Sequence, residues 1–258
     1  MSDAAPQSAA VPTQTGSSTK WVALAAMMFA VSMMFIDQTI VSIAIPTIQT
    51  ELGLSDAGVQ WVVNGYLLSL SAFFALGGRL SDILGHKKMV LLGVTIFAVS
   101  SAMCGATPDS GIAEAWLIFF RIIQGIGAAL LFPAALAIVV SVFPLKERGK
   151  ALALFFGITG GLTAIGPILG GYLSEWSWRA IFWVNVPVAI IAIILTLIAK
   201  IHTKHKREPL DYKGAVLIAL GMGFSVLGLQ QASSWGWVSW KTIGSIILGL
   251  ILLAIFVK

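Results

Sequence analysis

Charged residues are scarce in this sequence: they make up 10% of its 258 residues, whereas hydrophobic residues make up 58%. Soluble domains carry about 25% charged and about 45–50% apolar residues, so this composition excludes an ordinary soluble domain. The chain has a single cysteine, Cys104, which excludes an internal disulfide and a cysteine-based metal cluster. We expect an all-α integral membrane protein, because helices satisfy their backbone groups internally in lipid.

The sequence also lacks the motifs of enzymatic chemistry. It has no hydrolase triad and no G-x-x-x-x-G-K-[ST] phosphate loop, so we expect neither an enzyme nor an ATP-driven pump, and no cofactor. The segment Gly125–Leu130 lacks the third glycine and the preceding strand of a dinucleotide fingerprint. His202 and His205 have helical metal-ligand spacing, but they lie in a basic loop, and we interpret them as linker residues rather than a metal site.

Eight apolar runs are long enough to be membrane spans, since about 20 apolar residues cross about 30 Å of hydrocarbon. They follow residues 1–20, whose small and polar composition predicts a disordered tail. The predicted spans are Trp21–Ile45, Val59–Leu76, Met89–Thr107, Ala115–Phe143, Ala151–Ser174, Ala180–Ala199, Gly214–Gln231 and Thr242–Val257.

The net charge of +5 is explained by topology, and no nucleic acid partner is needed. Lys and Arg in short loops stay cytoplasmic, and with a cytoplasmic N-terminus most of the 16 basic residues fall on that side. Arg179 and Lys241 fall on the other side, and Arg121 lies within a span. The residues on the cytoplasmic side are Lys20, Arg79, Lys87, Lys88, Lys146, Arg148, Lys150, Lys200, Lys204, Lys206, Arg207, Lys213 and Lys258.

A short internal repeat predicts how the spans are organised. The sequence "GGRLSD" at Gly77–Asp82 recurs as "GGYLSE" at Gly170–Glu175, at span ends on opposite membrane faces. An inverted repeat of three spans plus three would produce this placement. Chance similarity between glycine-rich span ends is the alternative.

The segment "GGRLSDILGHKKMVL" resembles the loop between spans two and three of the major facilitator superfamily. Glycines permit a tight turn, Asp82 can accept bonds from a helix N-terminus, and lysines hold the loop at the anionic inner leaflet. Ile83 and His86 replace basic residues that are common in the family, and an ordinary positive-inside turn is the alternative. The matching positions are Gly78, Leu80, Asp82, Gly85, Lys87 and Lys88.

Three further regions narrow this resemblance. Arg121–Ala134 is similar to the span-four motif of proton-driven carriers, and Gly157–Gly171 is similar to the span-five motif of antiporters. "DQTIVSIAIP" and "WRAIFWVNVP" resemble the first and sixth spans of the fourteen-span drug/proton antiporters. The resemblance implies a six-helix N-terminal bundle, built as a 3+3 inverted repeat, followed by two additional transmembrane helices.

The span-five glycines predict close helix packing. Small residues four apart let helix backbones approach, and Pro167 adds a bend because it removes a backbone donor. Such a helix could be a hinge or a seal, and the resemblance implies a seal; plain packing is the alternative. The residues concerned are Gly157, Gly161, Gly166, Pro167, Gly170 and Gly171.

Asp37 and Arg121 are the charged residues predicted to lie inside the membrane. A central Asp or Arg costs about 2.5–3.5 kcal/mol on insertion scales, so such residues usually face a partner or a cavity. At 1.5 Å per residue, Asp37 lies about 12 Å and Arg121 about 9–10 Å from the outer ends of their spans. We expect them to share one polar cavity, paired directly or through Gln124, and to couple transport to protons. A permanent structural ion pair is the alternative.

An adaptable apolar substrate site is expected near the methionines of the first span, because methionine side chains fill irregular space. The candidate cavity residues are Met33, Met34 and Asn64. Lipid-facing or helix-packing methionines are the alternative.

We therefore predict a proton-coupled antiporter of the inner membrane that exports lipophilic compounds. The expected parts are a cytoplasmic tail at 1–20, a six-span bundle at 21–200, a cytoplasmic basic linker at 201–213 and an inserted pair of spans at 214–258. A C-terminal bundle is absent from the chain, so the expected partners are protons, a lipophilic substrate, the bilayer and the missing half. The alternatives are a non-transporting half-carrier with an interaction role, and a proton-coupled nutrient uptake carrier.

Overall fold

The computed structural model describes residues 17–199, 201 and 211–257, and all regular secondary structure in these ranges is helical. Eight segments are long and apolar enough to cross a membrane, which agrees with the predicted number of spans. The helices are α1 (Ser17–Leu52), α2 (Asp56–Leu84), α3 (His86–Gly105), α4 (Ala113–Val142), α5 (Leu145–Thr163), α6 (Ile165–Trp176), α7 (Ala180–Trp183), α8 (Asn185–Ile198), α9 (Tyr212–Trp235) and α10 (Trp240–Val257).

Helix ends extend beyond the predicted apolar runs. α1 begins at Ser17, so residues 17–20 are helical rather than part of the predicted tail. It also continues through Pro46 to Leu52, whereas the predicted span ends at Ile45. Residues 1–16 and 202–210, which hold the rest of the tail and most of the basic linker, lie outside the described residues.

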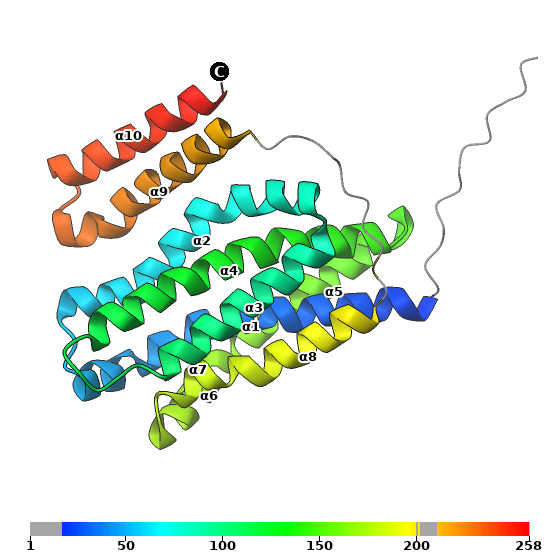
Figure 1. Ribbon diagram of the computed structural model, residues 1–258, viewed down its shortest axis with the longest axis horizontal. Coiled ribbons are helices and arrows are strands. Elements are labelled where there is room, and N and C mark those ends of the chain that lie inside the picture. Colours follow the sequence, from blue (N-terminus) through cyan, green and yellow to red (C-terminus); the bar gives the residue numbers. More distant parts are fainter. Residues whose placement is uncertain (1–16, 200, 202–210, 258) are drawn as a thin grey trace, which may run out of the picture.

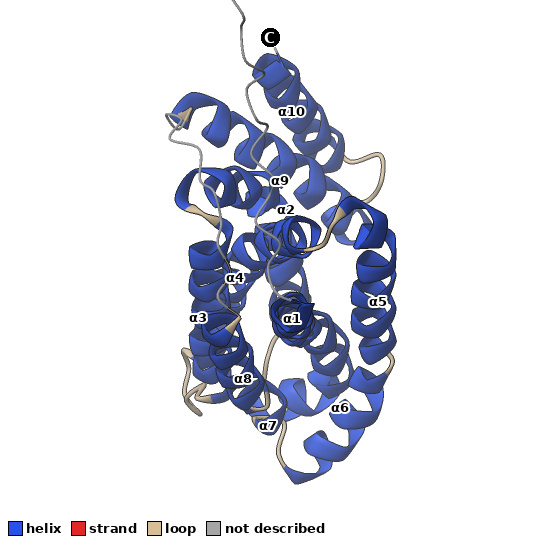
Figure 2. Ribbon diagram, turned by 90° about the vertical axis from the view of Figure 1, so that its right-hand side faces the viewer, coloured by secondary structure: helices blue, strands red, loops and turns tan. Residues whose placement is uncertain are grey.

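The first eight helices pack in a reciprocal pattern that matches the predicted inverted repeat. α2 and α3 of the first three-span unit pack on α4, the first helix of the second unit. α5, α6 and α8 of the second unit pack in return on α1, the first helix of the first unit. Figure 2 shows α1 almost end-on, with helices of the second unit around it. α1 and α4 are thus among the most buried helices, and between them a polar site can be kept from lipid.

Two spans are broken helices, and in the fifth span proline explains the break. This span is divided at Ala164, between α5 and α6, three residues before Pro167. Pro167 has no N–H to offer the carbonyl of Thr163, one turn earlier. The Thr39 hydroxyl of α1 lies 3.2 Å from that carbonyl and can donate to it, and it also lies 3.1 Å from the Ile36 carbonyl of its own helix. The predicted bend at Gly166–Pro167 is therefore present, and it is held by a contact from α1.

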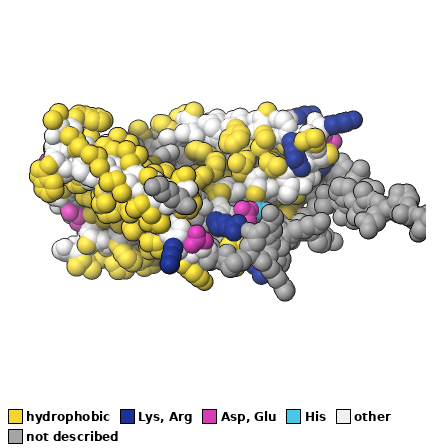
Figure 3. All heavy atoms as spheres, turned by 90° about the horizontal axis from the view of Figure 1, so that it is seen from above, with side chains coloured by type: hydrophobic (Ala, Val, Ile, Leu, Met, Phe, Trp, Pro, Cys, Tyr) yellow, Lys and Arg dark blue, Asp and Glu magenta, His cyan; other side chains and the backbone are white. Residues whose placement is uncertain are grey.

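α9 and α10 form a hairpin beside the other helices (Figure 1). α9 packs against α2, and α10 packs against α9. Gly221, Gly228 and Gly249 lie where the two hairpin helices approach, because a Cβ on any of them would meet atoms of the other helix. Figure 3 shows that hydrophobic side chains cover most of the face that includes this hairpin.

Apart from the interior Arg121, the described basic residues lie toward the two ends of the helices. The N-terminal ends of α1 and α9 and the α2–α3 and α4–α5 junctions lie toward one end of the long axis, while α7 and the α9–α10 turn lie toward the other (Figure 1). Lys20, Lys87, Lys146 and Lys213 belong to the first end. The lipid-facing middle is left almost free of charge, as an integral membrane protein requires.

Candidate functional site

Asp37 and Arg121 form an ion pair in the interior of the helix bundle. Nη1 of Arg121 donates to Oδ2 of Asp37 over 2.6 Å, and Arg121 and Asp37 are 1% and 0% exposed. Gln124 lies one helical turn after Arg121 on α4, where its Oε1 accepts from Arg121 over 2.8 Å and its Nε2 donates to Asp37 over 2.9 Å. Both routes expected from the sequence, direct pairing and pairing through Gln124, are thus present in the structure.

The guanidinium of Arg121 is fixed from a third helix as well. Its Nε donates to the backbone carbonyl of Val62 on α2 over 3.0 Å. The ring of Tyr66, also on α2, lies 4.4 Å from the guanidinium carbon. A cation over an aromatic face gains further attraction when water is excluded. Arg121 therefore links α1, α2 and α4 through one side chain.

Asn185 and Ser101 complete the cluster, and neither was identified as a site residue from the sequence. Nδ2 of Asn185, at the start of α8, donates to Oδ1 of Asp37 over 3.0 Å and to Oγ of Ser101 over 2.9 Å. Ser101 donates in turn to the carbonyl of Phe182 on α7 over 2.8 Å. Asn185 in the motif "WRAIFWVNVP" could have indicated this part of the site, because a buried amide needs hydrogen-bond partners.

The expected open polar cavity around this pair is not observed. The cluster residues are 0–2% exposed, so in this conformation they form a packed polar core. Burying an ion pair costs several kcal/mol per ion unless its hydrogen bonds are complete. Here each carboxylate oxygen has at least one donor. The cluster can hold a carboxylate away from water and tie neighbouring helices together.

The residues of the predicted cytoplasmic loop lie mostly within helices. Gly78 and Asp82 belong to the last turns of α2, and Gly85 alone separates α2 from α3. Gly85 has a φ of 96°, which favours glycine, and this is the expected tight turn. The N-cap residue of α3 is Gly85, which has no side chain to cap the helix, and no hydrogen bond from this N-terminus to Asp82 is present among the described contacts. Lys87 donates to the Leu197 carbonyl of α8 over 3.4 Å.

Lys88 lies one residue further along α3, with an exposed side chain. Next to the turn, Ser81 and His86 are joined by a bond of 2.6 Å between Oγ and Nδ1. The loop is therefore a helix junction held by neighbouring side chains and by α8.

The span-five glycines divide into two groups. A Cβ at Gly166 would collide with Thr39, and one at Gly170 would press on Ile40, so both glycines allow α6 to lie close to α1. A Cβ at Gly157, Gly161 or Gly171 would meet nothing within 4 Å. No close helix contact is present at Gly157 or Gly161 among the described residues, so close packing there stays a prediction.

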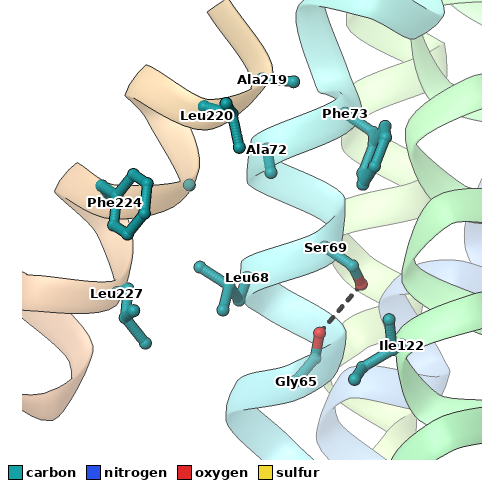
Figure 4. A pocket seen from close by; sticks show the side chains of 11 residues that line it. Gly65, Leu68, Ser69, Ala72, Phe73, Ile122, Ala219, Leu220, Phe224 and Leu227 are labelled. Atoms are coloured by element: carbon teal, nitrogen blue, oxygen red, sulfur yellow. Dashed lines mark hydrogen bonds between the residues drawn. The ribbon is translucent and has the colours of Figure 1, made fainter. Parts of the chain in front are cut away.

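Of the candidate substrate residues, Met33 and Met34 are buried in the apolar core of the bundle, and Asn64 is half-buried on α2. They do not line the hollow of about 280 Å³ that lies between α2, α4 and α9. Figure 4 shows Leu68 and Ala72 of α2 facing Leu220 and Phe224 of α9 across it. This hollow is apolar and contains none of the cluster residues.

Curated proteins with similar sequences include resistance and export proteins. The chain is 40% identical over 227 residues to the tetracenomycin C resistance and export protein of Streptomyces glaucescens, a match that covers 87% of this chain and 41% of that protein. It is 34% identical over 240 residues to the puromycin resistance protein of Streptomyces alboniger, with 92% and 47% covered. The chain thus spans less than half the length of these relatives.

Solved structures share the fold at low sequence identity. A POT peptide transporter superposes with a TM-score of 0.67 at 18% identity, over 94% of this chain and 53% of that one. The proton:xylose symporter XylE superposes with a TM-score of 0.61 at 16% identity, over 94% and 53%. The sequence model of the Major Facilitator Superfamily matches residues 27–257. With eight membrane-length helices, inverted packing and these relatives, the chain belongs to the Major Facilitator Superfamily as an all-α integral membrane protein.

Proposed function

We propose that this chain is the N-terminal part of a proton-coupled antiporter that exports lipophilic compounds by alternating access. The observation that carries the proposal is the buried cluster of Asp37, Arg121, Gln124 and Asn185, which is sealed from water in this conformation. Buried ionisable groups in membrane helices mark proton and substrate pathways. Asp37 is the proposed proton carrier, and Arg121 and Gln124 hold its ionised form. The export proteins among the relatives support the direction of transport.

The proposed location is the inner membrane, with a cytoplasmic N-terminus. The clustering of described basic residues at one end of the helices supports this orientation, because short basic loops remain cytoplasmic. We propose that residues 21–200 form the six-span bundle and that residues 214–258 form the inserted pair of spans. The loop residues Gly78, Asp82, Gly85, Lys87 and Lys88 are proposed to position α2 and α3 during the cycle.

Drug-dependent proton release tests the proposal. Energised inside-out vesicles with the full-length gene product should release protons on addition of puromycin or tetracenomycin C, the compounds in the relatives' names. Asp37→Asn should abolish the release at an unchanged level of membrane protein, since the amide takes up no proton. Asp56→Asn, which changes an exposed carboxylate outside the cluster, is the matched control. Undiminished release by the Asp37 variant would contradict proton coupling at this residue.

A half-carrier that does not transport alone is the second candidate. The observation that favours it is that the chain spans 41% and 47% of the two relatives. Alternating access needs two bundles that rock against each other, and the described helices supply one of them. Reconstituting the 258-residue chain with and without the remaining spans of a relative separates these candidates: transport by the chain alone would exclude the half-carrier.

A further inference from the structure

We infer that Asn185 responds to protonation of Asp37 by rotating its side-chain amide, so that it changes from a hydrogen-bond donor to an acceptor. This inference rests on the proposed function, because it requires Asp37 to take up a proton during the cycle. It assigns a positioning role to a residue of the sixth span and gives a route from the carboxylate to that span.

The hydrogen bonds to Asp37 suit an ionised carboxylate. Oδ1 accepts from Gln124 over 2.9 Å and from Asn185 over 3.0 Å, and Oδ2 accepts from Arg121 over 2.6 Å. All three partners use their N–H groups as donors. A protonated carboxyl group carries an O–H that needs an acceptor. Protonation therefore requires that at least one partner changes its role.

Arg121 and Gln124 are poorly placed to make that change. The guanidinium of Arg121 has donors and no acceptor. The Oε1 of Gln124 accepts from Arg121 over 2.8 Å, so rotation of this amide would place two donors against each other. A buried donor that faces another donor is destabilising. Gln124 is thus locked in its present orientation by the ion pair.

Asn185 is not locked in this way. Its Nδ2 donates to Asp37 and to the hydroxyl of Ser101, over 2.9 Å in the second case. A serine hydroxyl both donates and accepts, and its hydrogen rotates to suit its neighbours. When the amide turns by about 180° about its terminal torsion, its Oδ1 takes the place of Nδ2. Oδ1 then accepts from the new Asp37 O–H and from Ser101.

Protonation exchanges three hydrogen bonds for two. One proton binds to the Asp37 carboxylate, and the rotation breaks the two bonds that Asn185 Nδ2 donates to Asp37 and to Ser101. The Asp37 O–H then donates to Asn185 Oδ1. Ser101 moves its donated bond from the carbonyl of Phe182 to Asn185 Oδ1, and it thereby releases a link between α3 and α7. The helix break at Val184 separates Phe182 from Asn185. Protonation on α1 is in this way transmitted to the broken sixth span.

Other titratable groups face the same carboxylate. Tyr66 of α2 and Cys104 of α3 interact electrostatically with Asp37, as does Arg121 of α4. The hydroxyl of Tyr66 has no hydrogen-bond partner among the described residues, and no bond between Cys104 and Asp37 is present among the described contacts. Neither group is hydrogen-bonded to Asp37 among the described contacts, whereas Asn185 is, so the amide is the partner already in place to accept from a protonated carboxyl group.

Infrared spectroscopy with labelled asparagine tests the rotation directly. The 258-residue chain has two asparagines, Asn64 and Asn185, so an Asn64→Thr chain labelled with ¹³C at the asparagine amide reports Asn185 alone. Lowering the pH in lipid nanodiscs should produce a carboxyl band from Asp37. The labelled amide band should shift to lower wavenumber with the same midpoint, because its carbonyl then accepts an O–H. Asp37→Ala should remove both changes.

Two results would overturn the inference, and they differ. A carboxyl band that depends on Asp37, with a labelled amide band that does not move, would exclude the rotation and leave the proton role of Asp37 standing. If no carboxyl band disappears in the Asp37→Ala variant, protonation at Asp37 is excluded. Both the inference and the proton site of the proposed function would then fall. A concerted shift of both bands is the supporting result.

Discussion

Arg121 and Asp37 make each other's burial tolerable, because each supplies the counter-charge that replaces lost water. Removing one partner of a buried pair leaves an uncompensated charge, whereas removing both does not. The pair is therefore best tested by comparing single and double variants of the same chain.

We predict that Arg121→Leu lowers the free energy of unfolding by about 3–5 kcal/mol. The double variant Asp37→Leu with Arg121→Leu should lose clearly less, because no unpaired charge remains in the interior. Unfolding in a denaturing detergent, followed by tryptophan fluorescence, measures the difference. Equal or additive losses in the double variant would argue against a compensating pair.

The sequence predicted part of this cluster. Asp37 and Arg121 are visible as charges within apolar runs, and their similar depth led to the expectation that they meet. Asn185 and Ser101 carry no charge, and neutral polar residues are common in membrane spans. Their participation depends on how α8 and α3 are rotated about their own axes, and packing against neighbouring helices decides that rotation. No residue pattern in either span reveals it.

At the scale of single helices, the break in the fifth span depends on a hydrogen bond from another helix, which the Thr39 hydroxyl donates to the Thr163 carbonyl. We predict that Thr39→Val lowers the free energy of unfolding by about 1–3 kcal/mol, because the carbonyl of Thr163 then loses its donor. In a Pro167→Ala background the same change should cost less, since an alanine at this position would restore a backbone N–H one turn later. Equal costs in the two backgrounds, measured by detergent unfolding, would show that the Thr39 bond does not replace the missing one.

The two groups of span-five glycines give opposite expectations. Gly166→Ala should destabilise the chain by about 1–3 kcal/mol, because its methyl group would overlap the side chain of Thr39. Gly157→Ala, with open space around the position, should not lower the thermal unfolding midpoint of this chain, because alanine favours a helix more than glycine does. If the remaining spans of a full-length carrier cover that face, Gly157→Ala should nevertheless reduce transport. A fall in the stability of the isolated chain on Gly157→Ala would contradict the open face.

Helix limits were harder to predict than helix number. Apolar runs mark the part of a helix inside hydrocarbon, but α1 gains further turns at both ends, from Ser17 and through Pro46 to Leu52. Nothing in hydropathy reports such polar turns. The bend near Pro167 was predicted, since proline removes a donor at a known position. Its repair by Thr39 was not, because it needs a neighbouring helix.

For the molecule as a whole, the α9–α10 hairpin makes its main contact through α2. We predict that a chain ending at Ile201 keeps the α1–α8 bundle folded, with a thermal midpoint within a few degrees of that of the longer chain. Circular dichroism in detergent measures the midpoint, and the intact 258-residue chain is the control. Loss of cooperative unfolding would mean that the hairpin is needed for the bundle.

The number of spans was predictable at this scale, and the position of the hairpin was not. The basic residues predict an orientation in the membrane, which stays a prediction, and the repeated "GGRLSD" and "GGYLSE" segments indicated the inverted units with which the reciprocal packing agrees. α9 and α10 are apolar on most sides, so no face of either helix indicates its neighbour. α9 packs on α2, and α10 packs on α9 through their glycine-lined contact. The shapes of these contacts decide where the hairpin lies.

The open glycines of α5 have a mechanical consequence. Helices usually lock together through ridges of side chains that fit into grooves. Gly157, Gly160 and Gly161 leave this surface of α5 without ridges over one turn. A helix that packs on this surface meets no protruding side chains, so it can slide along α5 with little change in contact energy. In the proposed alternating-access carrier, such a smooth surface suits two halves that move past one another.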